Sequence, residues 1–415
     1  MEVKPGYKQT EVGVIPEAWE VVAVRRLVDE GILEKPLDGN HGNIHPKSSD
    51  FVDHGIPFVM ANNFLNGQVD LLRCKFITKQ GAEKLQKGFS IAGDVLLTHK
   101  GTVGNTAIVP DLSIEYIMLT PQVTYYRVRD ESRLNNQFLR QYFDSQPFQS
   151  LFKSLAGGGT RAYLGIVKQL ALPIIKPPID EQRAIAAMLS DVDAQLGGLD
   201  RLIAKKRDLK QAAMQQLLTG QTRLPGFRGE WEEKAVVDLA NVAKGTQLHS
   251  NETSDEGLFP HYNGGMFPSA YTDKANTAAD TIAISEGGNS CGYVQLIPER
   301  FWCGGHCYTL VPKSADKRFL YHALKGRQAA IMGLRVGSGL PNVQKTALEA
   351  FKVNLPADPA EQAAIAAVLS DMDAELAALE ARRNKTRDLK QAMMQELLTG
   401  RTRLVRPEHE GAASC

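Results

Sequence analysis

The chain has 415 residues, of which 43% are hydrophobic, and its formal net charge is +1 at pH 7. This length fits about two to four domains, and the composition supplies an ordinary core. The charge excludes a uniformly basic or acidic protein, but it leaves a nucleic-acid partner open because local patches steer binding. Sparse cysteines, a polar N-terminal segment and the lack of a long apolar run predict a soluble protein of the cytoplasm.

The first predicted elements are a connector and a short strand, and both occur twice. Residues 7–20 contain glycine, proline and one tryptophan, and residues 222–233 repeat this pattern, with Trp19 matching Trp231. A buried strand that runs into a polar loop follows in each half. The candidate DNA-binding residues of these two loops are Asn62, Asn63, Tyr262 and Asn263.

A Gly-rich loop between two strands comes next, within residues 92–109 and again within residues 278–297. In each half an acidic residue, Asp94 or Asp280, precedes the first strand. Such loops are exposed turns whose backbone N–H groups can bind phosphate, so each is either a DNA-contacting loop or an ordinary hairpin. The GxxxxGKS/T pattern of a P-loop is absent. The candidate DNA-binding residues here are Lys100, Thr102, Asn105, Glu286, Asn289 and Ser290.

Lys100 and Glu286 occupy matching places when the two Gly-rich loops are aligned by sequence. Lysine suits guanine, glutamate accepts a hydrogen bond from cytosine, and asparagine pairs with adenine. The difference between these two residues therefore predicts two loops that are tuned to different bases.

An amphipathic helical segment and a second polar loop complete each half. The helical spacing covers residues 135–155 and, in a shorter form, residues 318–334. The glycine-containing loops that follow are either DNA-binding loops or solvated turns. Their candidate DNA-binding residues are Thr160, Arg161, Tyr163, Asn342, Gln344 and Lys345.

The segment from Cys303 to Cys307, with Cys291 nearby, superficially resembles a zinc cluster. Its spacing lacks a second pair of ligands, and the first half of the chain has no counterpart. Core or strand cysteines are the simpler interpretation, and no metal site is predicted.

Two long helices are the most similar parts of the two halves. Residues 181–224 and 361–404 align without a gap and are identical at 29 of 44 positions, which indicates a duplicated unit. The 38 residues from Glu181 to Leu218 would span about 57 Å as a helix. We expect the two helices to pack on each other as a coiled coil, the alternative being that each packs only on its own domain. The apolar positions predicted for the partner-binding helices are Leu189, Val192, Leu196, Leu199, Leu369, Met372, Leu376 and Leu379.

The resulting plan is an α+β protein in which two α/β domains alternate with the long helices. The domains cover residues 1–178 and 222–357, the helices cover 179–221 and 358–404, and a tail covers 405–415. Antiparallel helices would relate the two halves by a pseudo-two-fold axis. No catalytic set emerges, since HExxH, GxSxG and the Gly-rich nucleotide fingerprint are absent. Together these absences favour a binding protein.

The sequence resembles the specificity subunit of type I restriction-modification enzymes. The resemblance is carried by the segments YKQTEVGVIPEAWE and AGDVLLTHKGTVG and by the paired EQ…LLTG helices, and it covers the chain up to residue 404. It implies that each globular part is a target recognition domain that reads one half of a split, asymmetric sequence in double-stranded DNA. It implies that the helices set the spacing between the halves.

The same resemblance implies that the helices bind two methyltransferase subunits, which carry S-adenosylmethionine. Restriction subunits that use ATP and Mg would join the complex. The chain itself would then be non-catalytic and bind no cofactor. The alternatives are a self-sufficient DNA methyltransferase or nuclease with an unrecognised active site, and a coiled-coil scaffold without a DNA role.

Overall fold

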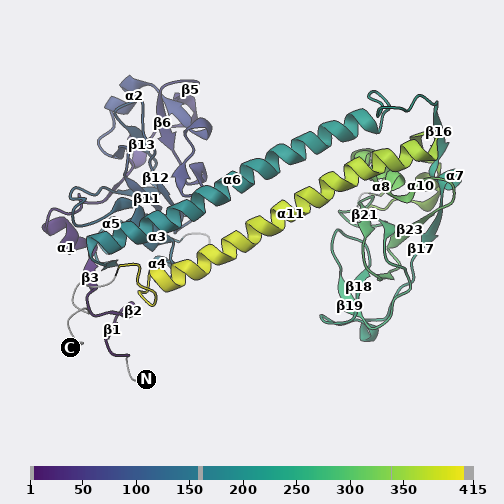
Figure 1. The fold of residues 1–415 in the computed structure, drawn as a ribbon. Helices are drawn as coiled ribbons and strands as arrows, with labels where there is room; N and C mark the ends of the chain where they lie inside the picture. The colour runs from purple at the N-terminus through teal and green to yellow at the C-terminus, as the bar shows by residue number, and fades with distance from the viewer. Residues whose placement is uncertain (1–3, 158–161, 338, 406–415) are drawn as a thin grey trace. The chain divides into compact units, whose positions relative to one another are not determined.

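The computed structural model describes residues 4–157, 162–337 and 339–405. It divides into two compact units: unit 1 contains the described residues up to 200 and from 382 onward, and unit 2 contains residues 201–381. Each unit holds a globular part and one half of each long helix, α6 (Ile179–Leu217) and α11 (Pro359–Leu397). The predicted mixed α/β fold with two long helices is confirmed (Figure 1).

Unit 1 contains a six-stranded sheet, of order β4-β14-β11-β12-β8-β7, and a five-stranded sheet, of order β10-β13-β6-β9-β5. Every residue of β11, β12 and β14 is buried, because these segments are continuous runs of apolar, aromatic and threonine residues. The first sheet consists of β4 (Leu37–Asp38), β7 (Phe64–Leu65), β8 (Gln68–Val69), β11 (Val95–Thr98), β12 (Thr106–Ile108) and β14 (Val123–Tyr126). The second consists of β5 (Phe51–Val52), β6 (Ile56–Val59), β9 (Lys75–Ile77), β10 (Phe89–Ser90) and β13 (Ile117–Leu119).

The helical segment predicted at residues 135–155 is two helices, α3 (Asn136–Asp144) and α4 (Gln146–Ala156). Ser145 between them is extended, and its hydroxyl accepts a hydrogen bond from the N–H of Phe148 at 3.4 Å. Pro147 lacks the N–H that a continuous helix would use, so a new helix starts here. The short helices of unit 1 are α1 (Val24–Asp29), α2 (Lys79–Glu83) and α5 (Ile166–Gln169).

Unit 2 is a smaller version of the same plan, with sheets of order β17-β23-β20-β21 and β19-β18-β22. Cys303 and Cys307 lie in strands and are buried, as the core interpretation predicts. The strands are β17 (Ala240–Lys244), β18 (Phe259–Tyr262), β19 (Ala270–Thr272), β20 (Thr281–Ser285), β21 (Val294–Ile297), β22 (Trp302–Cys303) and β23 (Cys307–Pro312). The short helices are α7 (Val236–Leu239), α8 (Lys317–Gly326), α9 (Gln328–Met332) and α10 (Lys345–Ala350).

A two-stranded antiparallel ribbon joins the start of each globular part to the segment before its long helix. In unit 1, β3 (Glu20–Ala23) pairs with β15 (Pro173–Lys176), and in unit 2, β16 (Trp231–Ala235) pairs with β24 (Lys352–Pro356). Unit 1 also has an N-terminal hairpin of β1 (Tyr7–Thr10) and β2 (Gly13–Pro16), whereas residues 222–230 of unit 2 form no strand.

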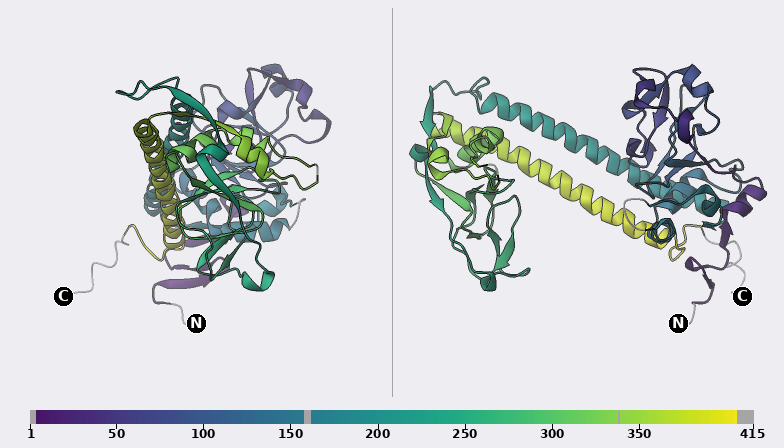
Figure 2. Two further views of the ribbon diagram at one scale, coloured as in Figure 1. Left: turned by 90° about the vertical axis from the view of Figure 1, so that its right-hand side faces the viewer. Right: turned by 180° about the vertical axis from the view of Figure 1, so that it is seen from behind.

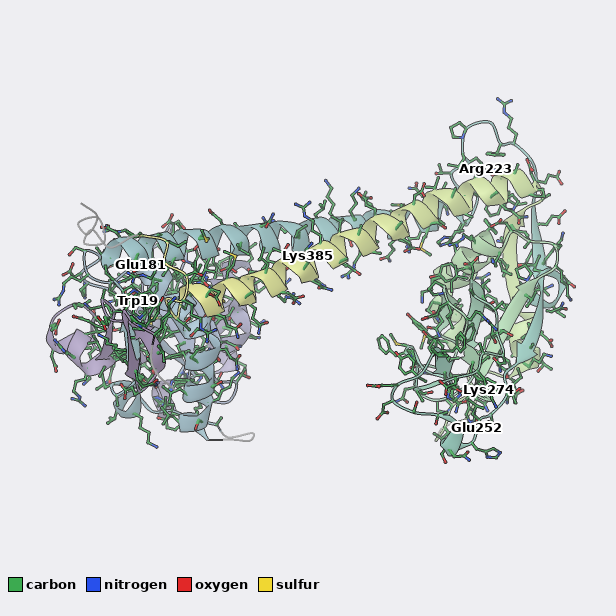
Figure 3. The ribbon with its side chains drawn as sticks, turned by 60° about the horizontal axis from the view of Figure 1, so that its bottom comes forward. Trp19, Glu181, Arg223, Glu252, Lys274 and Lys385 are labelled. Atoms are coloured by element: carbon green, nitrogen blue, oxygen red, sulfur yellow. The ribbon has the colours of Figure 1, made fainter. Side chains whose placement is uncertain are left out.

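A buried carboxylate fixes the beginning of each long helix. In unit 1, Glu181 accepts a hydrogen bond from Nε1 of Trp19 at 2.9 Å, and its Oε2 lies 2.7 Å from Nη2 of Arg403. Figure 3 shows Trp19 next to Glu181. The residues just after the end of α11 are therefore tied to the beginning of α6.

The second carboxylate, Glu361, makes the equivalent ion pair in unit 2. Its Oε2 lies 2.6 Å from Nη2 of Arg223, which follows the end of α6. Nε1 of Trp231, however, is buried and has no hydrogen-bond partner among the described residues. The two helix starts thus share the Glu–Arg pair but differ in the tryptophan bond.

The helices α6 and α11 run antiparallel within each unit. Rising residue numbers on α6 meet falling numbers on α11, and the views of Figures 1 and 2 agree on this pairing. The ion pairs between them are Asp193–Lys390 (2.7 Å) and Asp200–Arg383 (3.5 Å) in unit 1, and Lys206–Glu375 (2.6 Å), Arg207–Glu380 and Lys210–Asp373 in unit 2. No helix of the described residues has the length and apolar character needed to cross a membrane.

Each long helix also packs on a globular part, so both packing modes weighed from the sequence occur. Leu189 and Leu369 are fully buried in the cores of unit 1 and unit 2. These two side chains are unavailable to a partner chain, which corrects their predicted role. Among the other predicted positions, Leu199 is buried, while Val192, Leu196, Met372, Leu376 and Leu379 are half-buried.

Candidate nucleic-acid interface

The two polar loops predicted after β11 and after α4 meet in unit 1. Their meeting point, termed junction 1, is formed by residues 98–105 and 162–164. Two backbone hydrogen bonds of 3.0 Å hold it, Gly101 N–H to Ala162 O and Leu164 N–H to His99 O. Lys100 and Tyr163 are therefore neighbours, and both are exposed. Thr102 and Asn105 are exposed on the same loop, whereas Thr160 and Arg161 lie outside the described residues.

Unit 2 has the same arrangement, termed junction 2, between residues 285–290 and 341–343. Two backbone hydrogen bonds hold it, Gly288 N–H to Pro341 O at 3.0 Å and Val343 N–H to Glu286 O at 2.8 Å. Gly287 and Asn342 are the neighbours here. Of the other predicted residues, Asn289, Gln344 and Lys345 are exposed and Ser290 is half-buried.

The hydrogen bonds of the two junctions correct the alignment of Lys100 with Glu286. The carbonyls of His99 and Glu286 accept the equivalent bonds, so these two residues correspond. The register of the strands before the loops gives the same result. Lys100 then corresponds to Gly287, and the predicted exchange of lysine for glutamate at one position is wrong.

The one-residue error originates at the turn before the strand. Asp280 has a φ of 57°, which matches the turn at Gly93, whose φ is 82°. The left-handed region suits glycine and, less well, aspartate, so Asp280 replaces Gly93 there. Asp94 has a different role, because its carboxylate accepts hydrogen bonds from Arg127 at 2.8 Å. Matching the two aspartates by residue type therefore shifted the alignment.

A buried charged pair lies beneath junction 1. Asp38 is 2% exposed, and its Oδ2 lies 2.6 Å from Nε2 of His41 and 3.6 Å from Nε2 of His99. Burial opposes the ionisation of Asp38, but hydrogen bonds from Lys87 and His41 outweigh it and lower its pKa. Burial lowers the pKa of His99, and Asp38 only partly offsets this. His99 is fully buried, with Nδ1 lying 3.1 Å from the carbonyl of Leu164.

Beneath junction 2 a lysine and a glutamate take the places of Asp38 and His99. The strand registers place Lys244 where unit 1 has Asp38, and Glu286 stands where unit 1 has His99. Oε1 of Glu286 accepts hydrogen bonds from Nζ of Lys244 at 2.7 Å and from the hydroxyl of Tyr308 at 2.8 Å. Burial, together with the bond to Glu286, raises the pKa of Tyr308.

Two predicted DNA-binding side chains, those of Glu286 and Asn63, are buried and form hydrogen bonds within the protein. Glu286 is 8% exposed and holds Lys244 and Tyr308, so it supports the loop instead of facing outward. Asn63 is also buried, and its amide bonds to the backbone N–H of Met60 at 2.8 Å and to the carbonyl of Arg73 at 3.0 Å. Both predictions are corrected for this reason.

The remaining predicted residues near the first strands have mixed positions. Asn62 is exposed. Tyr262 is half-buried, and its ring lies 5.6 Å from that of Phe301. Asn263 accepts a hydrogen bond from the backbone N–H of His306 at 3.1 Å.

A cavity of about 320 Å³ opens beside junction 2. It brings together residues from four loops that are far apart in the sequence, and it includes the predicted residues Asn263 and Asn342. In the sequence, His306 stands out only as part of the segment from Cys303 to Cys307, which superficially resembles a zinc cluster. No local pattern predicts that it lines this cavity. The lining residues are Asn263, Gly264, Gly287, Gly288, His306, Leu340, Pro341 and Asn342.

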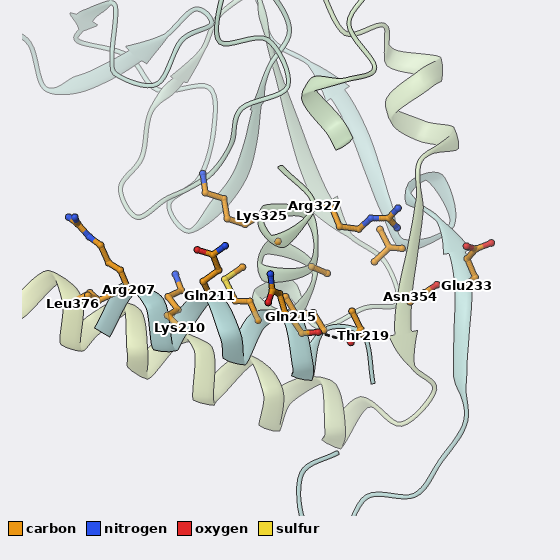
Figure 4. Close-up of a pocket in the computed structure, with 15 residues that line it drawn as sticks. Arg207, Lys210, Gln211, Gln215, Thr219, Glu233, Lys325, Arg327, Asn354 and Leu376 are labelled. Atoms are coloured by element: carbon orange, nitrogen blue, oxygen red, sulfur yellow. Dashed lines mark hydrogen bonds between the residues drawn. The ribbon is translucent and has the colours of Figure 1, made fainter. Parts of the chain in front are cut away.

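A second kind of cavity lies along the long helices. In unit 2 it measures about 720 Å³, between the last turns of α6 and residues of α8, β16 and β24 (Figure 4). A cavity of about 270 Å³ occupies the matching place on α11 in unit 1, where Val12, Val14 and Ile15 form part of its wall. The same five residues of the repeat line both, at the end of each long helix and just after it: Gln211, Met214, Gln215, Leu218 and Thr219 in unit 2, and Gln391, Met394, Gln395, Leu398 and Thr399 in unit 1.

The duplicated architecture agrees with a comparison of the chain with known families. Residues 17–204 and 228–386 match the model of the type I restriction modification DNA specificity domain. The chain belongs to this specificity family. Each of the two matched segments contains one globular part and most of the long helix that follows it, so the family domain occurs twice.

Relatives in the specificity family match over different lengths. A putative type I restriction enzyme specificity subunit of Methanocaldococcus jannaschii is 24% identical, over 96% of this chain and 97% of that protein. A putative type I specificity subunit of Mycoplasma genitalium is 36% identical over 35% of this chain and 39% of that protein. A Mycoplasma pneumoniae counterpart is 31% identical over 41% of this chain. The chain spans less than half the length of these two Mycoplasma relatives.

A solved structure has the same fold. The S subunit of a type I restriction-modification system from Mycoplasma genitalium matches with a TM-score of 0.68 at 19% identity. The match covers 96% of this chain and 98% of that one. The specificity-family fold therefore extends over both units and both long helices.

Proposed function

We propose that the chain is the DNA-recognition subunit of a type I restriction-modification complex, and that each unit reads one half of a bipartite, asymmetric target. The repeated junction carries this proposal. The same backbone frame presents Lys100 and Tyr163 in unit 1 but Gly287 and Asn342 in unit 2. Because side chains that contact base edges specify sequence, two loops with the same main-chain arrangement and different exposed side chains suit the recognition of two different base sequences.

The long helices have a second proposed role, which is to set the distance between the half-sites and to bind two methyltransferase subunits. The repeated residues that line a cavity in each unit support this role. Leu398 is buried in the core of unit 1, so two copies of one partner would meet the other four side chains at matching positions of the repeat. The globular parts offer each copy different surroundings.

The chain itself is proposed to be non-catalytic. In this scheme S-adenosylmethionine is bound by the methyltransferase subunits, and ATP and Mg by restriction subunits. Membership of the specificity family supports this division of labour. A self-sufficient methyltransferase is the competing function, and it makes a different prediction for the isolated chain.

The proposal is tested by selecting duplexes from a random pool with the full chain, alone and with its methyltransferase partner. We expect one split, asymmetric consensus with a fixed spacer, and binding that weakens steeply with salt because phosphates are neutralised. The chain alone should transfer no labelled methyl group to DNA. Methyl transfer by the chain alone, or the absence of any consensus under both conditions, contradicts the proposal.

A domain exchange tests the assignment of one half-site to each unit. Replacing residues 231–356 with the corresponding domain of another specificity-family member should change one half of the consensus and leave the other half and the spacer as they are. A change in both halves contradicts the assignment. Inserting four residues near Lys206, about one turn of helix, should instead change the spacer and neither half.

A further inference from the structure

The cavity beside junction 2 is lined by polar groups that suit a base better than a phosphate. Its side chains include Asn263, His306 and Asn342, and it reaches the backbone of Gly287 and Gly288. Among the described residues that line it there is no lysine or arginine. Phosphate binding relies on such cations, whereas amide and imidazole groups beside glycine backbone can approach the edge of a base.

The structure holds His306 in a defined position within this cavity. Its backbone N–H donates to Oδ1 of Asn263 at 3.1 Å, and its carbonyl accepts from the N–H of Glu286 at 2.9 Å. The side chain is 63% exposed, and Nδ1 lies 3.7 Å from Oε2 of Glu286. That oxygen is buried and has no hydrogen-bond partner among the described residues.

The buried carboxylate oxygen lies beside Nδ1 of His306, and its negative charge favours an N–H group there. In the tautomer that carries this N–H group, Nε2 keeps a lone pair and can accept a hydrogen bond. An acceptor of this kind pairs with the exocyclic amino group of adenine or cytosine. Asn342 narrows the choice, because an asparagine amide forms two hydrogen bonds with adenine, at N6 and N7. Base pairing leaves one N6–H free in the major groove, so Oδ1 of Asn342 and Nε2 of His306 would share it in a three-centre hydrogen bond.

Unit 1 presents different side chains at the same three places, and at two of them the side chain is larger. Lys100 stands where unit 2 has Gly287, and Tyr163 stands where unit 2 has Asn342. Gln122 corresponds to His306, since both carbonyls accept the equivalent backbone bond. Unit 2 is thus the unit in which glycine leaves room beside an amide and an imidazole.

The geometry points to this cavity as the site where unit 2 takes up one adenine edge of its half-site, read by Asn342 and His306. The inference rests on the proposed DNA-recognition function and adds the base class and the two residues that read it. Glu286 is a positioning residue, because it acts through the ring of His306.

The test uses the full chain with its methyltransferase partner and the duplex consensus selected by the wild type. Each adenine of the unit 2 half-site is replaced in turn by unsubstituted purine, which lacks the N6 amino group. At one position this change should weaken wild-type binding on the order of ten-fold. Asn342→Ala and His306→Ala should each weaken binding of normal DNA by a similar factor. In each variant, replacing the adenine at that position with purine should then weaken binding much less than it does in the wild type.

Two further variants separate base reading from folding. Gly287→Lys copies unit 1, and its Cβ has ordinary space, with no atom closer than 4.0 Å. This variant should select a changed base at the same position and keep the other half-site. Asn241→Ala, an exposed position on β17 outside the cavity, should keep wild-type affinity and the full purine penalty. Thermal unfolding of every variant should match the wild type.

Three results would overturn the inference while leaving the proposed function intact. One is a purine penalty that stays full in both Asn342→Ala and His306→Ala. Another is an unchanged consensus in Gly287→Lys. The third is a variant-sensitive position occupied by guanine, thymine or cytosine. If the wild type selects no consensus at all, the proposed function itself fails, and the inference fails with it.

Discussion

Junction 1 and junction 2 share a backbone frame and carry different titratable groups beneath it. In unit 1 the strand beside the loop supplies a carboxylate, Asp38, and the loop supplies His99. In unit 2 the strand supplies a cation, Lys244, and the loop supplies Glu286. Main-chain hydrogen bonds therefore fix the position of the loops in both junctions. The side chains around this frame are free to differ, as the proposed recognition of two different half-sites requires.

Each unit has a glycine directly after the strand residue that lies beneath its junction, Gly39 in unit 1 and Gly245 in unit 2. Substituting either glycine should have the largest effect on stability. A Cβ on Gly39 would lie 1.9 Å from the carbonyl oxygen of Leu119, and one on Gly245 would lie 2.2 Å from that of Gly304. We expect Gly39→Ala and Gly245→Ala each to lower the free energy of unfolding by about 4 kcal/mol, because backbone must move. Calorimetry of the full chain measures this loss.

The matched control is Gly198→Ala in α6, where a Cβ meets no atom within 4 Å. The repeat already has alanine at the corresponding position of α11, so this variant should be as stable as the wild type or slightly more so. If Gly39→Ala is as stable to unfolding as Gly198→Ala, the proposed need for glycine beside the junctions is contradicted.

The starts of the two long helices should differ in their dependence on the carboxylate. Glu181→Ala leaves both Nε1 of Trp19 and the guanidinium of Arg403 without their buried partner. We expect it to lower the free energy of local opening at the start of α6 by about 3 kcal/mol. Glu361→Ala should have a smaller effect at the start of α11, because Trp231 has no such bond to lose.

Hydrogen exchange at the first turns of α6 and α11 measures the two opening free energies separately. The conservative variants Glu181→Gln and Glu361→Gln serve as controls, since an amide oxygen still accepts hydrogen bonds. Equal losses for Glu181→Ala and Glu361→Ala would show that the tryptophan bond contributes nothing to the difference.

The buried histidine beneath junction 1 predicts a difference in pH dependence between the two junctions. The folded-state pKa of His99 lies below the usual histidine value of about 6.5. When junction 1 opens, His99 regains its higher pKa, so opening is coupled to proton uptake as the pH falls below about 6.5. Junction 1 should therefore lose stability in mild acid, and His99→Gln should remove most of this dependence. Junction 2 has Glu286 at the corresponding place and should respond less.

Hydrogen exchange of the backbone N–H groups of Leu164 and Val343 reports on the two junctions across this pH range. Chemical exchange rates must be corrected for pH before the comparison. Equal acid sensitivity at both residues, or a sensitivity at junction 1 that persists in His99→Gln, would contradict the assignment to His99.

The smallest expected effect concerns Lys100, the exposed cation that unit 2 replaces with Gly287. If Lys100 contacts a phosphate, Lys100→Ala should weaken binding about three-fold and reduce the salt dependence by about one phosphate contact, without changing the consensus. If it contacts a base, the unit 1 half-site should change. Filter binding at several salt concentrations, combined with site selection, distinguishes these outcomes. An affinity identical to that of the wild type would remove Lys100 from the interface.

The sequence was sufficient to predict the long helices and the strands on either side of the Gly-rich loops. Apolar residues at helical spacing and a 44-residue repeat are signals that accumulate over many positions. The short strands β11 and β20 were predictable because each is a run of buried residues ending in a polar, Gly-rich loop. Pro147 also marks the break between α3 and α4, although the spacing alone suggests one helix.

The side-chain roles at the junctions were much less predictable. Asp280 resembles Asp94 in sequence but adopts the backbone conformation of Gly93, and this φ value depends on the fold around it. The sequence around Glu286 predicts an exposed DNA-binding side chain, but in the structure Glu286 binds Lys244 and Tyr308, which lie on other strands. These contacts join residues that are distant in the chain, so no local pattern shows them.

The pair between Glu181 and Arg403 has a consequence for synthesis of the protein. Its two residues are 222 positions apart, whereas Arg223 and Glu361 are 138 apart. Leu397 and Leu398 also belong to the core of unit 1. At about 5–20 residues per second, roughly 10–45 s separate the appearance of Glu181 from that of Arg403. The domain that leaves the ribosome first is therefore the last to be completed, and it waits with part of its core uncovered while unit 2 is made.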